Sequence, residues 1–147
     1  MGLVLDSSVV IAAERSGQTV AEFFRGIVSQ CGNQRVTLTA VGLSEMVHAI
    51  YRAPTDALRN RREIFIQNLL NDMEILPFAT DAAFRAGRID GEQRALGLTI
   101  PGIDLLIGAT ALSYGYNLAT KNLRHFQMIP GLTIVQLQGG NGFGLYL

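Results

Sequence analysis

The sequence predicts an α/β protein, a three-layer α/β/α domain with a five-stranded parallel sheet. Short runs of strand-favouring residues alternate along the chain with longer segments in which apolar residues recur at helical spacing. This alternation is typical of a parallel sheet with helices on both faces. A chain of 147 residues with 48% hydrophobic residues is large enough for one domain with its own core.

The first predicted strand is the aliphatic run Leu3-Val4-Leu5, which ends in Asp6. An ionised carboxylate directly after a buried strand is costly unless its charge is compensated. Sheets of this class bind their ligands at the carboxyl edge of the strands. Asp6 is therefore the first candidate for a functional residue.

The middle of the chain supplies a second acidic candidate. The elements predicted after the first strand are a short helix capped by Ser7 and ending near 16–17, a helix over 19–31, a strand over 35–40, a helix over 41–51 and a long helix capped by Thr55 or Asp56. In the 41–51 helix, Glu45 borders the apolar face near the helix start.

A third acid stands in the second half of the chain. The elements predicted there are a strand over 74–76, a helix over 80–97, a helix within 101–116, a strand at 118–120, a helical turn over 123–126 and a strand over 132–137. Asp104 is the only charged residue from 101 to 116. A helix that is apolar on nearly every face is buried, so Asp104 is expected to enter the interior. Asn122, just after the 118–120 strand, adds a polar candidate.

The chain divides into a predicted domain over 1–137 and a glycine-rich tail over 138–147, whose Phe143, Leu145 and Tyr146 are expected to contact the body or a partner.

The single cysteine, Cys31, excludes an internal disulfide and favours a reducing, cytoplasmic location. The chain shows no secretory signal pattern. Its longest uncharged run falls short of the roughly 18 apolar residues of a membrane span.

The side chains of Asp6, Glu45, Asp104 and Asn122 are expected to meet at one edge of the sheet, provided that the first and fourth strands are neighbours. Carboxylates a few ångströms apart raise one another's pKa, and a bound cation relieves the repulsion. Carboxylate and amide oxygens without cysteine or clustered histidine favour Mg²⁺, or Mn²⁺, over Zn²⁺. The sequence thus predicts a metal site suited to phosphoryl chemistry.

All the residues expected at this site carry side-chain oxygens: Asp6, Glu45, Asp104, Asn122, Ser7 and Thr120. The two aspartates are expected to be direct metal ligands. Glu45 is expected to bind a second ion or to act as the base that positions water. The Asn122 amide would hold a metal-bound water. The hydroxyls of Ser7 and Thr120 would donate hydrogen bonds to the metal-ligating side chains without touching the metal.

Five motifs in this order resemble a PIN domain, specifically a VapC-type toxin ribonuclease: Leu5-Asp6-Ser7-Ser8, Ser44-Glu45, the 104–112 run, the 119–122 step and the 126–132 segment. The resemblance covers almost the whole chain. It implies a Mg²⁺-dependent endoribonuclease, the toxin of a type II toxin-antitoxin pair, which is inhibited by a VapB-like antitoxin and is usually a homodimer. Asn122 stands where many relatives have a fourth acid, so a tightly held second metal is not implied.

Basic residues are expected to hold the RNA. Lysine and arginine together number 12, as do aspartate and glutamate. Three acids bound to metal would leave nine acids against twelve basic groups. Arg59, Arg61 and Arg62 cluster in one helix and are the predicted substrate-binding residues. The alternative is that they form a solvated helix face.

Two other classes of protein share some of these features. A phospho-receiver domain needs a pair of acids after its first strand and an aspartate after its third, whereas Asp6 stands alone and the third strand leads into Pro77. A catalytically weak PIN-like scaffold that mainly binds a protein partner remains the alternative function. His125, close to Asn122 in the sequence, is a further candidate for substrate contact.

Overall fold

The computed structural model describes residues 2–137 and 145–146. Its strands are β1 (Gly2–Leu5), β2 (Arg35–Thr39), β3 (Glu74–Leu76), β4 (Asn117–Thr120), β5 (Ile134–Leu137) and β6 (Leu145–Tyr146). Its helices are α1 (Ser7–Arg15), α2 (Val20–Cys31), α3 (Ala40–Tyr51), α4 (Asp56–Leu70), α5 (Thr80–Ala95), α6 (Gly102–Tyr114) and α7 (Leu123–Phe126). Each predicted strand and helix is present, with shifts only at the ends.

The strands form one sheet in the order β3-β2-β1-β4-β5-β6. β1 to β5 are all parallel, which confirms the predicted five-stranded parallel sheet. The structure adds β6, which pairs antiparallel with β5 through Leu137 and Leu145. The rest of the predicted tail, including Phe143, lies outside the described residues.

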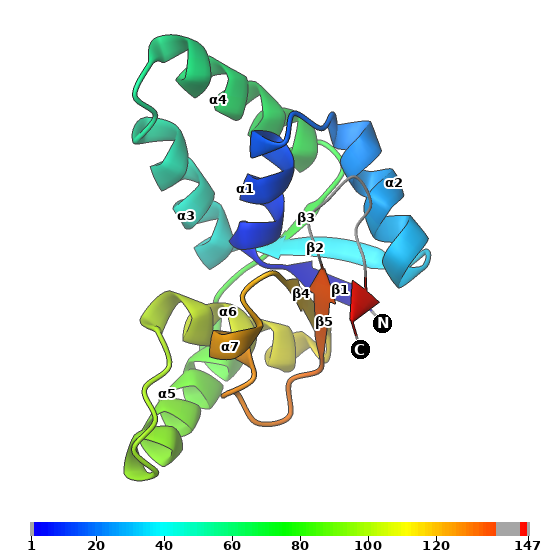
Figure 1. The fold of residues 1–147 in the computed structure, drawn as a ribbon. Helices are drawn as coiled ribbons and strands as arrows, with labels where there is room; N and C mark the ends of the chain where they lie inside the picture. The colour runs from blue at the N-terminus through cyan, green and yellow to red at the C-terminus, as the bar shows by residue number, and fades with distance from the viewer. Residues whose placement is uncertain (1, 138–144, 147) are drawn as a thin grey trace.

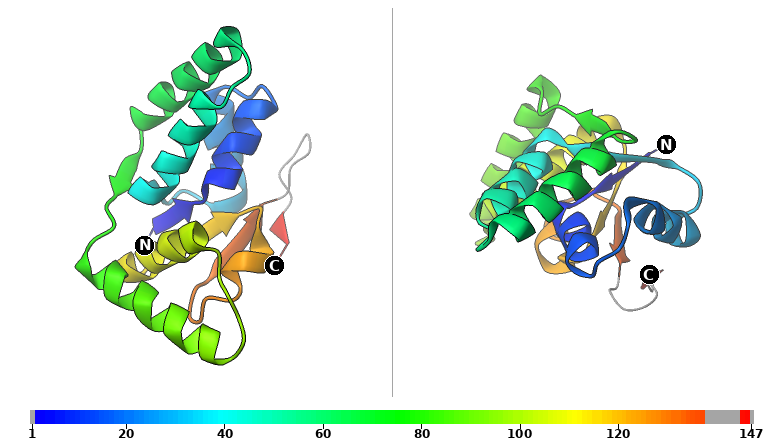
Figure 2. Two further views of the ribbon diagram at one scale, coloured as in Figure 1. Left: turned by 90° about the vertical axis from the view of Figure 1, so that its left-hand side faces the viewer. Right: turned by 90° about the horizontal axis from the view of Figure 1, so that it is seen from above.

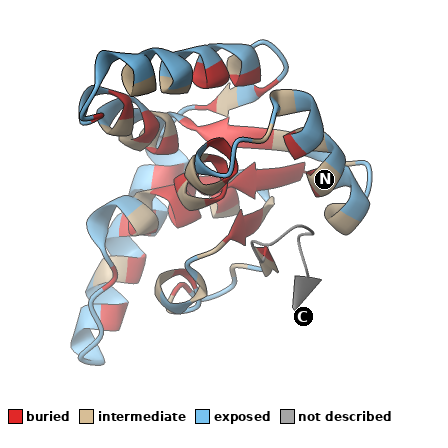
Figure 3. Cartoon of the chain, turned by 45° about the horizontal axis from the view of Figure 1, so that its top comes forward, coloured by how far each residue is buried: buried red, intermediate tan, exposed pale blue. Residues whose placement is uncertain are grey.

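Helices cover both faces of the sheet (Figures 1 and 2). One core cluster joins α1, α2, α3 and α4 to Leu3 and Leu5 of β1, and the other joins α5, α6 and α7 to Val4. Successive residues of a strand point to opposite faces, so β1 is apolar throughout because both of its faces are covered. Figure 3 shows the resulting pattern, in which buried strands lie between helices whose outer sides are exposed.

Threonines fix the starts of three helices. The side chains of Thr19, Thr39 and Thr55 accept hydrogen bonds from backbone N–H groups in the first turns of α2, α3 and α4. The predicted cap at Ser7 is wrong: the N-cap position of α1 is Asp6, and Ser7 is the first helical residue. The Ser7 hydroxyl is thereby free to contact other side chains.

α7 is held firmly against α6, although it is only one turn long. Phe126 and Ile129 are buried in the same core cluster as α6, and a side chain at Gly108 would collide with Ile129. Gln93 of α5 donates a hydrogen bond to the Met128 carbonyl at 2.7 Å. The turn between β4 and β5 is thus anchored to both α5 and α6. No helix of residues 2–137 has both the length and the apolarity needed to cross a membrane.

Candidate active site

Asp6 lies at the carboxyl edge of the sheet, where β1 and β4 end side by side. Its backbone N–H donates to the Ala119 carbonyl at 2.9 Å, which continues the ladder between the two strands. Because the strands are parallel and adjacent, Asp6 and Thr120 reach the same edge. The Asp6 residue is only 2% exposed, so protein groups must replace the water around its carboxylate.

Three hydroxyl groups surround the Asp6 carboxylate. Ser8 Oγ donates to Oδ2 at 2.7 Å, Thr120 Oγ1 donates to the same oxygen at 2.9 Å, and Ser7 Oγ lies 3.4 Å from Oδ1. Two of these hydroxyls come from the first turn of α1 and one comes from the neighbouring strand. The donors are uncharged, so they offset lost hydration without neutralising the acid.

Ser7 links Asp6 to Glu45. Its hydroxyl oxygen lies 2.8 Å from Glu45 Oε1, so it serves chiefly the glutamate. Partial burial raises the pKa of Glu45, the hydrogen bond from Ser7 opposes this shift, and the negative charges of Asp6 and Asp104 raise the pKa further. The three acids predicted from sequence therefore lie near enough to repel one another.

Asp104 reaches the same edge from the first turn of α6. α6 lies beside the start of α3, where Gly42 faces Ile107. Burial raises the pKa of Asp104, the hydrogen bond and the charge of His125 lower it, and the charge of Asp6 raises it. His125 Nδ1 lies 2.7 Å from Asp104 Oδ2.

The turn after β4 carries Asn122 and His125. The Asn122 backbone N–H donates to Thr120 Oγ1 at 2.8 Å, and the Lys121 N–H donates to Ser8 Oγ at 3.3 Å. Asn122 Nδ2 lies 3.2 Å from His125 Nδ1. This turn thus brings an amide and an imidazole to the acids. Sequence reasoning placed His125 only as a substrate contact, and its position three residues after Asn122 was the one signal available.

The donor atoms at this edge suit a hard divalent cation in kind, since they are carboxylate, amide and hydroxyl oxygens. Burial is the main cause of the raised pKa values of Glu45 and Asp104, and the neighbouring negative charges, which a cation would offset, raise them further. Within residues 2–137 and 145–146, however, no three His, Cys, Asp or Glu side chains lie close enough as they stand to hold a metal ion.

The raised pKa values predict a pH dependence of stability without metal. An acid with a raised pKa in the folded state binds more protons folded than unfolded, so the free energy of unfolding falls as pH rises above about 4. Glu45→Gln removes one such group. Thermal melts in EDTA across pH should show a flatter profile for Glu45→Gln than for the wild type. A matched change at the exposed Glu63 should leave the profile as it is, and equal profiles for all three proteins would contradict the raised pKa of Glu45.

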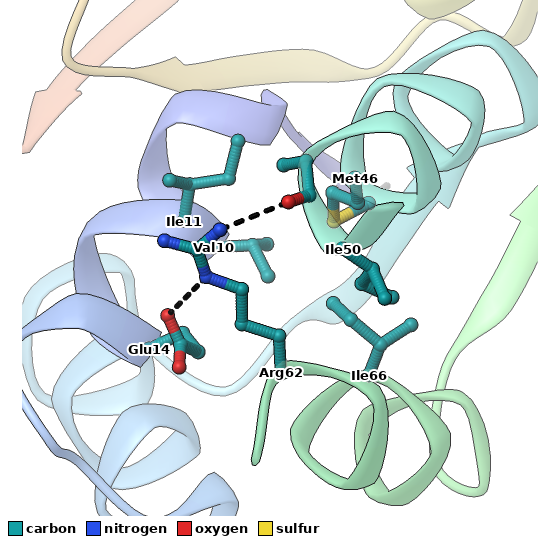
Figure 4. A pocket seen from close by; sticks show the side chains of 8 residues that line it. Val10, Ile11, Glu14, Met46, Ile50, Arg62 and Ile66 are labelled. Carbon is teal, nitrogen blue, oxygen red and sulfur yellow. Dashed lines mark hydrogen bonds and ion pairs between the residues drawn. The ribbon is translucent and has the colours of Figure 1, made fainter. Parts of the chain in front are cut away.

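The contacts of the three arginines of α4 are with groups other than Asp6, Glu45 and Asp104. Arg61 Nε lies 3.1 Å from the carboxylate of Glu14. Arg62 Nε lies 3.7 Å from the same carboxylate, and Arg62 also donates to the Ala49 carbonyl at 2.9 Å (Figure 4). Arg59 lies over the Tyr51 ring, 5.6 Å from its centroid. Glu14 is eight residues beyond Asp6, about 12 Å along α1. The structure thus shows Arg61 and Arg62 compensating a buried acid.

The PIN domain family model matches residues 3–131 of this chain. Ribonuclease VapC1 of Rickettsia felis is 30% identical over 135 residues, which cover 92% of this chain and 96% of that protein. The tRNA(fMet)-specific endonuclease VapC of Salmonella typhimurium is 30% identical over 100 residues, 68% of this chain and 74% of that protein.

Solved structures share the fold at lower identity. A VapBC2 complex from Rickettsia felis bound to promoter DNA contains a chain that aligns with a TM-score of 0.82 and 20% identity, over 94% of this chain and 100% of that chain. A DNA-bound VapBC complex from Salmonella typhimurium gives a TM-score of 0.77 and 24% identity, over 92% and 98%. The chain therefore belongs to the PIN domain family, among the VapC ribonucleases.

Proposed function

We propose that this protein is a Mg²⁺-dependent endoribonuclease that acts as the toxin of a type II toxin-antitoxin pair. The observation that carries the proposal is the convergence of Asp6, Glu45 and Asp104 at the carboxyl edge of β1 and β4, where burial and mutual repulsion raise the pKa values of Glu45 and Asp104. Membership of the PIN family and relatives named as ribonucleases support the same reading.

In this proposal Asp6 and Asp104 are the metal ligands. A bound Mg²⁺ or Mn²⁺ would supply Lewis-acid stabilisation of the phosphodiester and a lowered pKa for an attacking water. Ser8 and Thr120 hold the Asp6 carboxylate in place, because each donates a hydrogen bond to Oδ2. Ser7 does the same for Glu45. The roles of Ser7 and Thr120 are therefore to orient acids.

Glu45 is the proposed base that positions the attacking water. A carboxylate with a raised pKa accepts a proton more readily near neutral pH than an ordinary one, and the pKa of Glu45 is raised by burial and by two neighbouring acids. Ligation of a second ion is the other role open to it. Asn122 cannot act as a base, because its side chain is a neutral amide. It would hold a water at the exposed side of the site.

Arg59 is the first of the proposed RNA contacts to consider, because Arg61 and Arg62 already compensate Glu14. The side chain of Arg61 is 58% exposed and that of Arg62 only 16%. Arg61 therefore retains N–H groups for a phosphate, whereas Arg62 would have to leave the interior. We keep all three as proposed substrate-binding residues, with Arg59 and Arg61 ahead of Arg62.

The proposed partner is a VapB-like antitoxin, and a homodimer is the proposed assembly. The structural relatives named above were solved as VapBC complexes. A cavity of about 20 Å³ opens between α1, α3 and α4, with the Glu14 and Arg62 pair at its side (Figure 4). Its apolar lining comes from Val10, Ile11, Met46, Ala49, Ile50 and Ile66. It holds roughly one water molecule. A partner helix would place a single apolar side chain there and cover the surrounding helices.

Inhibition by such an antitoxin should weaken as Mg²⁺ rises. An arginine or lysine of the antitoxin that reaches Asp6, Glu45 and Asp104 would compete with the metal for the same negative charge. Cleavage should be measured at fixed antitoxin over a Mg²⁺ series, with NaCl at equal ionic strength as the control for screening. If inhibition does not change with Mg²⁺ concentration, and Asp6, Glu45 and Asp104 stay open to solvent in the toxin-antitoxin complex, the antitoxin blocks RNA entry instead.

The proposed function is tested by RNA cleavage with the purified protein freed of any antitoxin. Cleavage should appear with Mg²⁺ or Mn²⁺, stop with EDTA and return when the metal is restored. New 5′ ends mapped after brief induction in cells would identify the RNA. A folded protein that binds its antitoxin but cuts no RNA with either metal would favour the alternative, a catalytically weak scaffold.

A further inference from the structure

His125 makes the shortest polar contact of Asp104. Its Nδ1 lies 2.7 Å from Oδ2, in the length range of charge-assisted hydrogen bonds. A carboxylate only accepts, so the proton of this hydrogen bond belongs to Nδ1. The same nitrogen lies 3.2 Å from Asn122 Nδ2. Asn122 Nδ2 is itself a donor, so it could bond to Nδ1 only if that nitrogen carried no proton. The shorter distance to Asp104 Oδ2 therefore places the proton on Nδ1 and leaves the amide in packing contact.

The imidazole is held in place by the fold. His125 precedes Phe126, which is fully buried, and Ile129 packs closely against Gly108 of α6. The Met128 carbonyl accepts from Gln93 of α5. α7 therefore presents His125 from a fixed position to the first turn of α6. A ring fixed in this way restricts the rotation of the Asp104 side chain.

The contact uses one of the two carboxylate oxygens. Asp104 has two oxygens with about four acceptor positions, and the imidazole takes one of these positions on Oδ2. Nδ1 can carry the donated proton in both protonation states of the ring, so the contact orients Asp104 in either state. Hydrogen-bonded partners behind a metal-ligating carboxylate or imidazole set its orientation, and losing such a partner typically costs about 10- to 100-fold in metal affinity or activity.

We propose that His125 is a positioning residue of this site, which fixes the Asp104 carboxylate for metal binding through the Nδ1 hydrogen bond. The inference rests on the proposed function and adds a residue to it. His125 acts through Asp104, so its removal should lower metal affinity as well as turnover. In the competing arrangement, the imidazole of His125 binds the Asp104 carboxylate in place of the metal. Removing the imidazole would then tighten metal binding.

Three variants separate these arrangements. In His125→Asn the side-chain amide nitrogen is as many bonds from the backbone as Nδ1, so the donor to Asp104 is kept. In His125→Gln the amide nitrogen lies one bond further out, as Nε2 does, and His125→Leu has no donor. The exposed Gln127, two residues along, gives the matched control Gln127→Ala.

Mn²⁺ affinity should be measured by calorimetry on the full chain, alongside RNA cleavage and thermal melts in EDTA. We expect His125→Leu and His125→Gln to bind Mn²⁺ about 10- to 100-fold more weakly than the wild type, and His125→Asn and Gln127→Ala to stay close to it. Wild-type affinity in His125→Leu, tighter binding in that variant, or equal losses in the Asn and Gln variants would overturn the inference. If the wild-type protein binds no Mn²⁺, the proposed metal site itself is ruled out.

Discussion

We expect Asp6→Asn and Asp104→Asn each to abolish RNA cleavage while the protein stays folded. Each change keeps the size of the side chain and removes the charge that attracts the metal, so it opens no cavity. The metal-free melting temperature of Asp104→Asn should equal or exceed that of the wild type, because burial and the charge of Asp6 already raise the pKa of this acid. Cleavage of a labelled RNA at saturating Mg²⁺ measures the loss.

Asp81→Asn is the matched control for this prediction. Asp81 lies in the first turn of α5 as Asp104 lies in the first turn of α6, but it is exposed and pairs with Arg85. Its replacement should leave cleavage unchanged. Retention of more than about a tenth of the activity in Asp6→Asn or Asp104→Asn, a loss smaller than about 1.4 kcal/mol, would remove that aspartate from the proposed ligands.

The largest effect on stability should come from the arginines that compensate Glu14. The Glu14 side chain is only 7% exposed and has Arg61 and Arg62 as its charged partners. The double variant Arg61→Gln/Arg62→Gln leaves that carboxylate buried and uncompensated. Such a loss typically costs about 3 to 5 kcal/mol. Urea unfolding of the wild type, each single variant and the double variant would measure it.

Adding Glu14→Gln to the double variant should restore part of the lost stability, because the buried group is then neutral. Arg85→Gln removes an exposed pair with Asp81 and should cost less than about 1 kcal/mol. A double variant that keeps wild-type stability but binds RNA weakly, with a smaller salt dependence, would mean that these arginines serve RNA as the sequence first suggested.

The fold follows from local patterns in the sequence. β1 is a short apolar run, β4 has Leu118 and Ala119 buried at its centre, and parallel connections through helices leave few ways to order such strands. Asp6, Glu45 and Asp104 stood out because each is a charge in an apolar setting. The structure brings these three acids to one edge because β1 pairs with β4 and the start of α3 packs beside α6.

Contacts between distant side chains were beyond the reach of sequence patterns. Ser7 has the residue type of a helix cap, but in the fold its hydroxyl contacts Glu45, which is 38 residues away. Arg61 and Arg62 look like a solvated or RNA-binding cluster until α1 brings Glu14 beside them. His125 gives no periodic signal because α7 is a single turn. The short β6 was hidden in a glycine-rich segment with no strand pattern.

Calorimetric titration of the wild-type protein and of Asp6→Asn with Mn²⁺ tests the central claim most directly, since it asks whether the acids at the edge of β1 and β4 bind a divalent metal. The account predicts saturable Mn²⁺ binding by the wild type, release of protons on binding because the pKa values of Glu45 and Asp104 are raised, and loss of binding in Asp6→Asn. Equal Mn²⁺ binding by both proteins, or none by a wild-type protein that still cuts RNA, would contradict it.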